Sequence, residues 1–272
     1  MGSTVSSLRL ALADRYAVER ELGRGGMAIV YLASDRRHPR RVAIKVLDAQ
    51  LTGLANAGRF LQEIRLMATL QHPHILPLFD SGEVLGEPYY VMPYIEGETL
   101  RARLQREGRL GVEESVRIMR EVASALDYAH RQGVVHRDVK PENILLSDGH
   151  ALVADFGIAR ALLADSDAAR RLTATGVALG TPGYMSPEQA MGEHAVDARS
   201  DIYALGALAH EMLAGSPPFT GPSAQAVLAR VLTESPPPLT QVRRGVPASI
   251  SDVVQRALAP EPSDRPATAR AS

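Results

Sequence analysis

Short apolar runs, broken by glycine, proline and charged clusters, fill the chain from Tyr16 to about Tyr94. Such runs predict β-strands, here over Val18 to Leu22, Ile29 to Ala33, Val42 to Leu47, Leu76 to Asp80 and Tyr89 to Met92. One helix is predicted among them within residues 59–70, because apolar residues recur there at helical spacing, at Phe60, Ile64, Met67 and Leu70. Glu63 falls on the same stripe. A carboxylate that faces a core requires a cation beside it.

Beyond Tyr94 the pattern changes to longer amphipathic helices. The apolar spacing predicts helices over residues 113–131, 201–213 and 250–258. Gly133 and Gly215 are predicted to end the first two, and Ser249 with Asp252 three positions later resembles a capping box for the third. The sequence therefore predicts a small β-rich N-terminal lobe, joined near residues 93–97 to a larger helical lobe. Ligands favour clefts of this kind.

Composition narrows the function classes. The chain has 272 residues, 45% of them hydrophobic, and a net charge of -1, which argues against nucleic acid as a partner. It contains no cysteine, so disulfides, cysteine zinc sites and thiol nucleophiles are excluded. No apolar run approaches the length that a bilayer requires. We therefore expect a cytoplasmic location, with membrane contact only through segments that are not present in this chain.

The densest chemical signal is His-Arg-Asp-Val-Lys-Pro-Glu-Asn at residues 136–143, followed by Asp-Phe-Gly at residues 155–157. A glycine-rich loop at residues 22–30 precedes Val-Ala-Ile-Lys at residues 42–45. Small residues between strands let backbone N–H groups approach phosphate oxygens, and a strand lysine supplies a cation. Carboxylate and amide oxygens suit Mg²⁺. Together these residues predict a phosphoryl-transfer site.

From Tyr16 to Pro266 the chain resembles the eukaryotic-like (Hanks-type) serine/threonine protein kinases, most closely their bacterial members. The resemblance implies the α+β, bilobal protein-kinase fold, with a β-rich N-lobe that carries one regulatory helix and a mainly helical C-lobe. The implied boundaries are an N-terminal extension over 1–15, an N-lobe to about 92, a hinge at about 93–97 and a C-lobe over about 98–272 that is truncated in its last helix. It also implies transfer of the γ-phosphate of ATP to serine or threonine hydroxyls of protein substrates.

The resemblance assigns the chemistry to a few residues. Asp138 corresponds to the catalytic aspartate that orients the substrate hydroxyl, and Lys140 stands beside it as in serine/threonine kinases. Lys45 would hold the α- and β-phosphates while paired with the core-facing Glu63. Asp201 resembles the buried aspartate that anchors the backbone of the catalytic loop, although it also suits the N-terminus of its helix as a plain charge.

The implied cofactors are ATP and Mg²⁺, with Mn²⁺ as a substitute for Mg²⁺, and the implied metal ligands are Asn143 and Asp155. Pro93 has no N–H, so the hinge offers its carbonyl and the N–H of Ile95. Ala28 departs from the commonest family pattern, which has a third glycine at that position. The expected nucleotide contacts are Leu22, Gly23, Gly25, Gly26, Val30, Ala43, Lys45, Met92, Pro93, Tyr94, Ile95 and Leu145.

The same resemblance predicts two regulatory phosphorylation sites and one structural ion pair. Thr173 and Thr175 align with threonines that bacterial relatives phosphorylate, so we expect autophosphorylation there, with Arg137 as the partner of the phosphate. Glu188 is expected to pair with Arg265, although as isolated residues both suit a solvated surface.

Alternatives to an active protein kinase remain open. A pseudokinase scaffold is disfavoured because the full set of catalytic residues is present, and a small-molecule phosphotransferase is disfavoured because residues 180–188 look like a platform for a protein substrate. We also expect that two copies could form a homodimer for autophosphorylation in trans. Many of the bacterial kinases that it resembles are receptors, in which a cytosolic kinase domain is tethered to a membrane segment. We therefore expect this chain to be the cytosolic domain of a bacterial signalling kinase.

Overall fold

A computed structural model describes residues 2–25, 28–47, 64–156, 182–192 and 196–271. These residues divide into two compact units. The first unit draws its described residues from Met1–Gln71 and Leu76–Glu96, and the second from His72–Ile75, Gly97–Gly157 and Ala169–Ser272. No helix in these described ranges is long and apolar enough to cross a membrane.

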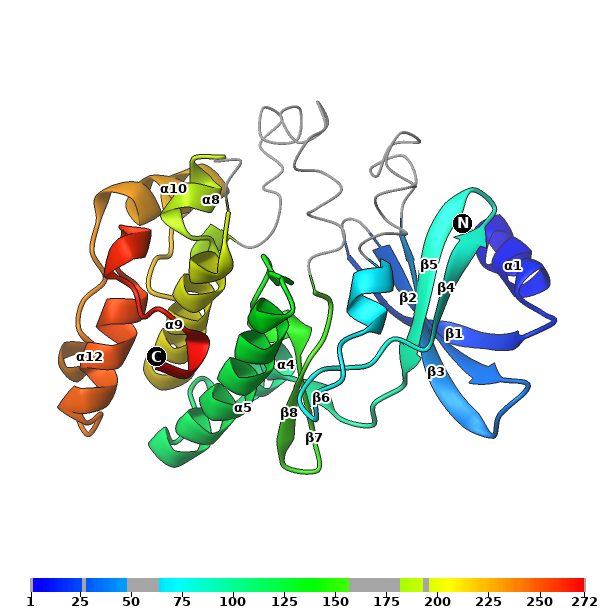
Figure 1. The fold of residues 1–272 in the computed structure, drawn as a ribbon, viewed down its shortest axis with the longest axis horizontal. Helices are drawn as coiled ribbons and strands as arrows, with labels where there is room; N and C mark the ends of the chain where they lie inside the picture. Colours follow the sequence, from blue (N-terminus) through cyan, green and yellow to red (C-terminus); the bar gives the residue numbers. More distant parts are fainter. Residues whose placement is uncertain (1, 26–27, 48–63, 157–181, 193–195, 272) are drawn as a thin grey trace. The chain divides into compact units, whose positions relative to one another are not determined.

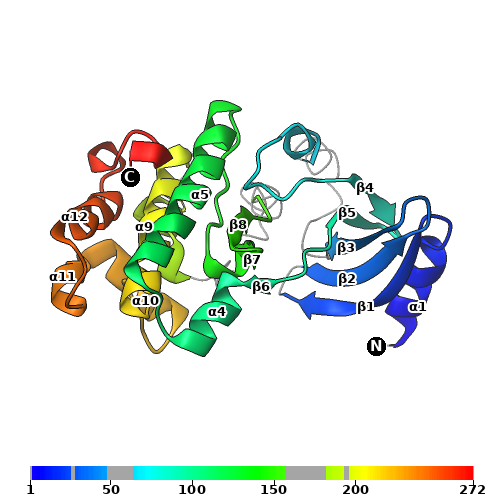
Figure 2. The ribbon, with the colours of Figure 1, turned by 90° about the horizontal axis from the view of Figure 1, so that it is seen from below.

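The first unit is built on a five-stranded antiparallel sheet in the order β1-β2-β3-β5-β4 (Figures 1 and 2). Its strands are β1 (Tyr16–Arg24), β2 (Ala28–Asp35), β3 (Arg40–Leu47), β4 (Asp80–Val84) and β5 (Glu87–Pro93). Four of the five predicted strands are confirmed. The strand predicted at residues 76–80 is wrong, because the pairing occurs at β4 instead. Leu85 and Gly86 form the β4–β5 turn with φ values of 54° and 78°, and this two-residue turn fixes the register so that Val84 faces Glu87.

Helix α1 (Gly2–Ala11) adds a layer to the first unit, beside the end of the sheet where β1 begins (Figure 1). Leu8 and the following Leu12 are buried in the main core of this unit, which also contains Tyr16 and Tyr31. Leu10, on the other face of the helix, is 80% exposed. The helix and the residue that directly follows it therefore contribute one apolar side chain each to the core of the sheet.

The helix predicted over residues 59–70 is confirmed where the chain is described, at residues 64–68. Ile64 is 2% exposed and packs with Leu47 and Tyr90 in a second core cluster. Glu63 lies outside the described residues, so its expected orientation stays a prediction.

The second unit is mainly helical (Figures 1 and 2). Its helices are α4 (Leu100–Glu107), α5 (Val112–Arg131), α8 (Pro187–Ala190), α9 (Ala198–Ala214), α10 (Ala224–Thr233), α11 (Leu239–Val242) and α12 (Ala248–Ala257). Helix α9 lies between α5 and α12, and every residue from Ser200 to Leu213 is buried. A helix that is covered on all sides forms the centre of its unit. The two long predicted helices thus correspond to α5 and α9.

The ends of these helices test the capping predictions. Gly215 follows α9 with φ 92°, in the left-handed region that glycine tolerates best, as predicted. The capping box predicted at Ser249 is wrong, because α12 starts one residue earlier and Pro247 precedes its first turn. A capping box does occur at Ser186, where α8 begins.

A three-stranded sheet completes the second unit in the order β6-β7-β8, from β6 (Glu98–Thr99), β7 (Ile144–Ser147) and β8 (His150–Val153). The segment His72–Ile75 belongs to this unit although the chain on both sides of it belongs to the first. Val153 N–H donates to the carbonyl of His74 at 2.8 Å, and Ile75 forms a parallel bridge with Val153. The ring of His72 stacks on Tyr128 of α5 at 5.3 Å.

Candidate active site

The loop at residues 136–143 is anchored by Asp201, which lies in the first turn of α9 and is 1% exposed. Its carboxylate accepts the backbone N–H of His136 and of Arg137, each at 2.7 Å. His130 Nε2 lies 2.8 Å from the same carboxylate. A buried carboxylate that accepts this many hydrogen bonds fixes the loop backbone, so the predicted anchoring role of Asp201 is confirmed.

His136 is fully buried and supports the loop from the inside. Its Nε2 lies 3.1 Å from the carbonyl of Ala154, which can only accept, so Nε2 carries the proton. The other ring nitrogen, Nδ1, is then free to accept the backbone N–H of Asp138 at 3.3 Å. The ring also packs against Phe156, with centroids 4.6 Å apart. His136 thereby ties the loop to the chain that follows β8.

Asp138 is the centre of the predicted chemistry, and its carboxylate is about a quarter exposed. Lys140 Nζ donates to Asp138 Oδ2 at 2.6 Å. Asn143 Nδ2 donates both to the Asp138 carbonyl at 2.8 Å and to Oδ2 at 3.2 Å. The structure thus brings together three of the predicted site residues around one carboxylate, which is held in a single orientation.

Asn143 and Asp155, the expected metal ligands, lie on the two segments joined by β7 and β8. The N–H of Ala154 donates to the Asn143 carbonyl at 2.9 Å, which ties these segments together. Asp155 has φ 59°, an uncommon backbone for a non-glycine residue. The Asn143 amide nitrogen is engaged by Asp138, so its side-chain oxygen is the atom offered to a cation. Two oxygen donors fit Mg²⁺, which keeps several waters, whereas the described residues contain no group of three or more histidine or acidic side chains suited to a metal.

Apart from Leu145, the described residues that are expected to bind the nucleotide belong to the first unit. Ala43 of β3 faces Met92 of β5, and Lys45 faces Tyr90 on the same pair of strands. Lys45 Nζ lies 5.9 Å from the centre of the Tyr90 ring, within the range of a cation–π contact. Ala43 and Lys45 are two positions apart in β3, so the apolar side chain and the ammonium group lie on the same face of the strand.

The glycine-rich loop is described up to Gly25 and again from Ala28. Gly25 N–H donates to the Ala28 carbonyl at 2.9 Å, which closes the β1–β2 turn. A Cβ at Gly23 would meet nothing within 4 Å. Packing within the protein therefore does not require glycine at this position, which leaves room for a ligand to approach the backbone.

The residues expected at the hinge begin at Pro93, the last residue of β5. Tyr94 N–H donates to the Arg41 carbonyl at 3.3 Å, and Pro93 has no N–H to offer. Of these three residues, Ile95 is thus the one whose N–H suits the predicted hinge donor. Leu22 and Val30 lie in β1 and β2, and Leu145 lies in β7 of the second unit. The residues Gly26, Glu63, Thr173 and Thr175 fall outside the described ranges.

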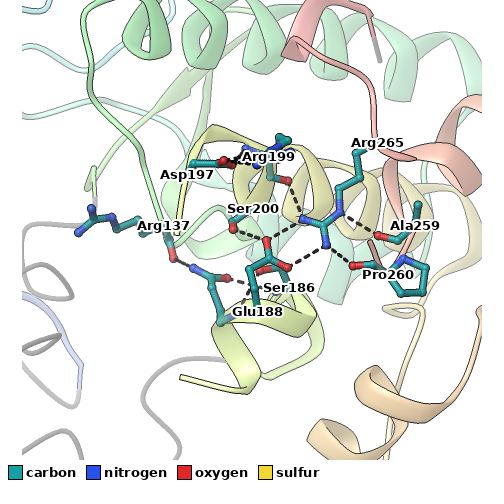
Figure 3. Close-up of polar contacts among 10 residues, drawn as sticks. Arg137, Ser186, Glu188, Asp197, Arg199, Ser200, Ala259, Pro260 and Arg265 are labelled. Carbon is teal, nitrogen blue, oxygen red and sulfur yellow. Dashed lines mark hydrogen bonds and ion pairs between the residues drawn. The ribbon is translucent and has the colours of Figure 1, made fainter. Parts of the chain in front are cut away.

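Glu188 and Arg265 form a buried ion pair, as predicted (Figure 3). Arg265 donates to both carboxylate oxygens, at 2.7 and 2.8 Å, and Ser200 Oγ donates to one of them. The remaining donors of Arg265 reach the carbonyls of Ala259, Pro260 and Arg199 at 2.7–3.0 Å. The surface interpretation of these charges is therefore excluded, because they join α8, α9 and the C-terminal segment.

The pKa of Glu188 reflects two opposing causes. Burial by itself raises the pKa of the carboxyl, but the hydrogen bonds from Arg265 and Ser200 outweigh it, so the pKa lies below its ordinary value of 4.5. The carboxylate is the form that the fold stabilises.

A second polar cluster escaped the sequence analysis. Arg101 of α4 donates to Glu142 at 2.9 Å and to Glu211 of α9 at 2.7 Å, and it also donates to the hydroxyl of Tyr184. Tyr184 in turn donates to Glu211. Burial, with the charge of Glu211 next, raises the pKa of Tyr184. The partners of Arg101 lie 41, 83 and 110 positions away in sequence, so no local pattern could reveal the cluster.

Comparison with known proteins agrees with this geometry. Residues 16–272 match the family model for the protein kinase domain. The serine/threonine-protein kinase PknB of Mycobacterium tuberculosis (strain ATCC 25618 / H37Rv) is 42% identical over 264 residues, which cover 95% of this chain and 42% of PknB. PknL of Mycobacterium bovis is 42% identical over 269 residues, which cover 98% of this chain and 66% of PknL. The chain thus spans less than half the length of its PknB relatives.

Solved structures show the same fold. The crystal structure of the Mycobacterium tuberculosis PknI kinase domain superimposes with a TM-score of 0.75 at 34% identity, and the match covers 94% of this chain and 92% of that domain. The predicted α+β kinase fold is therefore confirmed. With a family model that matches almost the whole chain and relatives at 42% identity, this chain belongs to the protein kinase family, among the bacterial serine/threonine kinases of the Hanks type.

Proposed function

We propose that this domain transfers the γ-phosphate of ATP to serine or threonine hydroxyls of proteins. The observation that carries the proposal is the arrangement around Asp138, whose carboxylate is oriented by Lys140 at 2.6 Å and by Asn143 at 3.2 Å. Phosphoryl transfer depends mainly on positioning and on charge stabilisation. A fixed carboxylate beside a fixed ammonium group supplies both.

The residues divide the work in the following way. Asp138 accepts a hydrogen bond from the substrate hydroxyl, directs its oxygen toward the γ-phosphorus and receives the proton. Lys140, already bonded to Asp138, places a positive charge where negative charge develops during transfer. Asn143 and Asp155 would hold Mg²⁺, or Mn²⁺ in its place, and the ion would neutralise the phosphate oxygens. In the first unit, Lys45 paired with Glu63 binds the α- and β-phosphates.

The remaining nucleotide contacts are made by the glycine-rich loop, by apolar side chains and by the residues expected at the hinge. We assign the adenine to Val30, Ala43, Met92 and Leu145, with the carbonyl of Pro93 and the N–H of Ile95 as its polar edge. The loop residues from Leu22 to Gly26 cover the phosphates. This assignment is supported by the shared face of Ala43, Lys45 and their β5 partners.

The test replaces the central carboxylate. Asp138→Asn keeps the shape of the side chain but cannot take up the proton, so kcat should fall by about 10²-fold or more while the Kd for ATP stays within about twofold. Incorporation of labelled phosphate from Mg-ATP into a generic protein measures the first quantity, and equilibrium binding measures the second. Wild-type turnover in Asp138→Asn, or no transfer by the wild type, refutes the proposal. Transfer only to a small molecule such as an aminoglycoside would point to the related phosphotransferases.

We further propose that Thr173 and Thr175 are autophosphorylated and that Arg137 receives the phosphate. A phosphate carries about -1.5 to -2 charges, and a guanidinium binds it through paired hydrogen bonds. Incubation with Mg-ATP followed by mass spectrometry should find phosphate at both positions in the wild type and at neither in Asp138→Asn. The double alanine variant should lose most activity. Full activity of that variant, or an active wild type without these phosphates, refutes this switch.

The setting of the domain is also a proposal. Its relatives PknB and PknL are longer proteins, and we propose that the chain, with residues 16–272 as its kinase domain and 1–15 as an extension, is the cytosolic part of a membrane-anchored signalling kinase. Autophosphorylation would then occur in trans within a homodimer. Analytical ultracentrifugation over a range of concentrations tests the dimer.

A further inference from the structure

Gln189 links helix α8 to the catalytic loop within the second unit, and the proposed function gives this residue no role. It is the third residue of α8, directly after Glu188, and its side chain makes two hydrogen bonds. Oε1 accepts the backbone N–H of Ser186 at 3.2 Å, which completes the capping box of α8. Nε2 donates to the carbonyl of Arg137, in the catalytic loop, at 3.0 Å. The orientation of the amide is unambiguous, because Ser186 N–H can only donate and the Arg137 carbonyl can only accept.

The peptide that Gln189 reaches is the one that joins Arg137 to Asp138. Its carbonyl accepts from Gln189, and its N–H, which belongs to Asp138, donates to His136 Nδ1 at 3.3 Å. Both polar atoms of this peptide plane are therefore held by side chains. The N–H of the preceding peptide is held by Asp201.

This restraint acts on Arg137, a residue with an unfavourable backbone conformation. Arg137 has φ 65°, in the left-handed region that is unfavourable for a residue with a Cβ. Without a fixed carbonyl, the Arg137–Asp138 peptide could rotate about ψ of Arg137 and φ of Asp138, so this left-handed residue would be restrained only on its N-terminal side, where Asp201 holds its N–H. The same rotation would turn the Asp138 carboxylate away from Lys140 and Asn143, which hold it at 2.6 and 3.2 Å.

We infer that Gln189 is a positioning residue, which locks the Arg137–Asp138 peptide to the start of α8 and so keeps the catalytic carboxylate aligned. The inference rests on the proposed function for its catalytic consequence, although the restraint itself can be measured without turnover. It assigns to α8 a role besides its buried ion pair, because the helix also controls the backbone of the catalytic loop.

Two substitutions separate the two hydrogen bonds. Gln189→Glu keeps an acceptor for Ser186 N–H but loses the donor to Arg137, whereas Gln189→Lys keeps a donor of similar reach but loses the acceptor. The loss of one such hydrogen bond should lower kcat about three- to tenfold. We therefore expect this decrease in Gln189→Glu and in the neutral Gln189→Ala, with the KM for ATP unchanged. Gln189→Lys should retain a higher kcat than either.

Amide hydrogen exchange supplies the readout that does not need activity. The Asp138 amide should exchange about three- to tenfold faster in Gln189→Glu and Gln189→Ala than in the wild type, while the amides of α9 keep their rates. Thermal unfolding identifies any variant that fails to fold, and exchange and kinetics are compared only among folded variants. The capping box retained in Gln189→Glu favours folding of at least that variant.

The outcomes are distinct. An active wild type with unchanged kcat and unchanged Asp138 exchange in Gln189→Glu overturns the inference but leaves the proposed function intact. A larger loss of kcat in Gln189→Lys than in Gln189→Glu assigns the effect to the helix cap and overturns the inference as well. An inactive wild type refutes the proposed function, and the exchange rates of Asp138 alone then decide whether Gln189 holds the loop.

Discussion

Arg265 has no exposed side-chain surface, and its charge is balanced by Glu188, of which only 6% of the side chain is exposed. Removal of two charges from water costs several kcal/mol for each ion, and only a complete set of hydrogen bonds offsets that cost. Here the guanidinium finds both carboxylate oxygens and three backbone carbonyls. Loss of one partner is therefore far more harmful than the small value of a surface ion pair.

Glu188→Gln should lower the free energy of unfolding by about 3 kcal/mol at pH 7, because it leaves the charge of Arg265 buried and uncompensated. The folded-state pKa of Glu188 lies below 4.5, so the stabilisation by the carboxylate is fully present above that pH and is lost as the pH falls through the lowered pKa. Urea unfolding at a series of pH values from 7 downward should show the gap between wild type and variant narrowing toward acid. The exposed Glu261→Gln serves as the control, and a gap that does not change with pH would contradict the prediction.

At the scale of single elements, α1 lies outside the residues that match the family model, which begin at Tyr16. Leu8 lies within the helix and Leu12 directly follows its last residue, at a spacing of four that continues one helical face. A single pair of this kind is too short a pattern to predict a helix. We attribute the formation of the helix to its packing on the sheet, because both leucines are buried in the core of the first unit.

Leu8 and Leu10 offer a matched test of that packing, because both lie within α1 and their exposures are 3% and 80%. The change to alanine alters helix propensity equally at the two positions. Leu8→Ala should therefore lower the free energy of unfolding by about 2–4 kcal/mol, and Leu10→Ala by less than about 0.5 kcal/mol. Chemical denaturation measures both. Equal effects would mean that α1 does not contribute to the core of the sheet.

Strand β4 is the element that the hydrophobic pattern of the sequence failed to predict. The apolar residues before Asp80 attract a strand prediction, yet the strand itself reads Asp-Ser-Gly-Glu-Val. Polar residues are tolerated because β4 is the edge of the sheet, and the turn at Leu85 and Gly86 selects which residues pair. Register is thus a property of the hairpin, which local hydrophobicity does not report.

At the scale of the whole molecule, the sequence predicted the order of sheet and helices because each element carries its own periodicity. It also indicated the residues around Asp138, since a dense motif places them within eight positions. The contacts that join distant segments were harder to foresee. The pairing of Glu188 with Arg265 came from the family resemblance, whereas the bonds of Gln189 and the cluster around Arg101 depend on how α4, α8 and α9 pack, and no sequence pattern encodes that packing.

The segment His72–Ile75 makes the two units inseparable by a single cut of the chain. Each unit is assembled from more than one stretch of sequence, and these four residues complete the second unit from within the sequence of the first. A fragment that began at Gly97 would lack the carbonyl that Val153 N–H binds and the ring that stacks on Tyr128. A single cut of the chain therefore cannot separate the two units without dividing at least one of them.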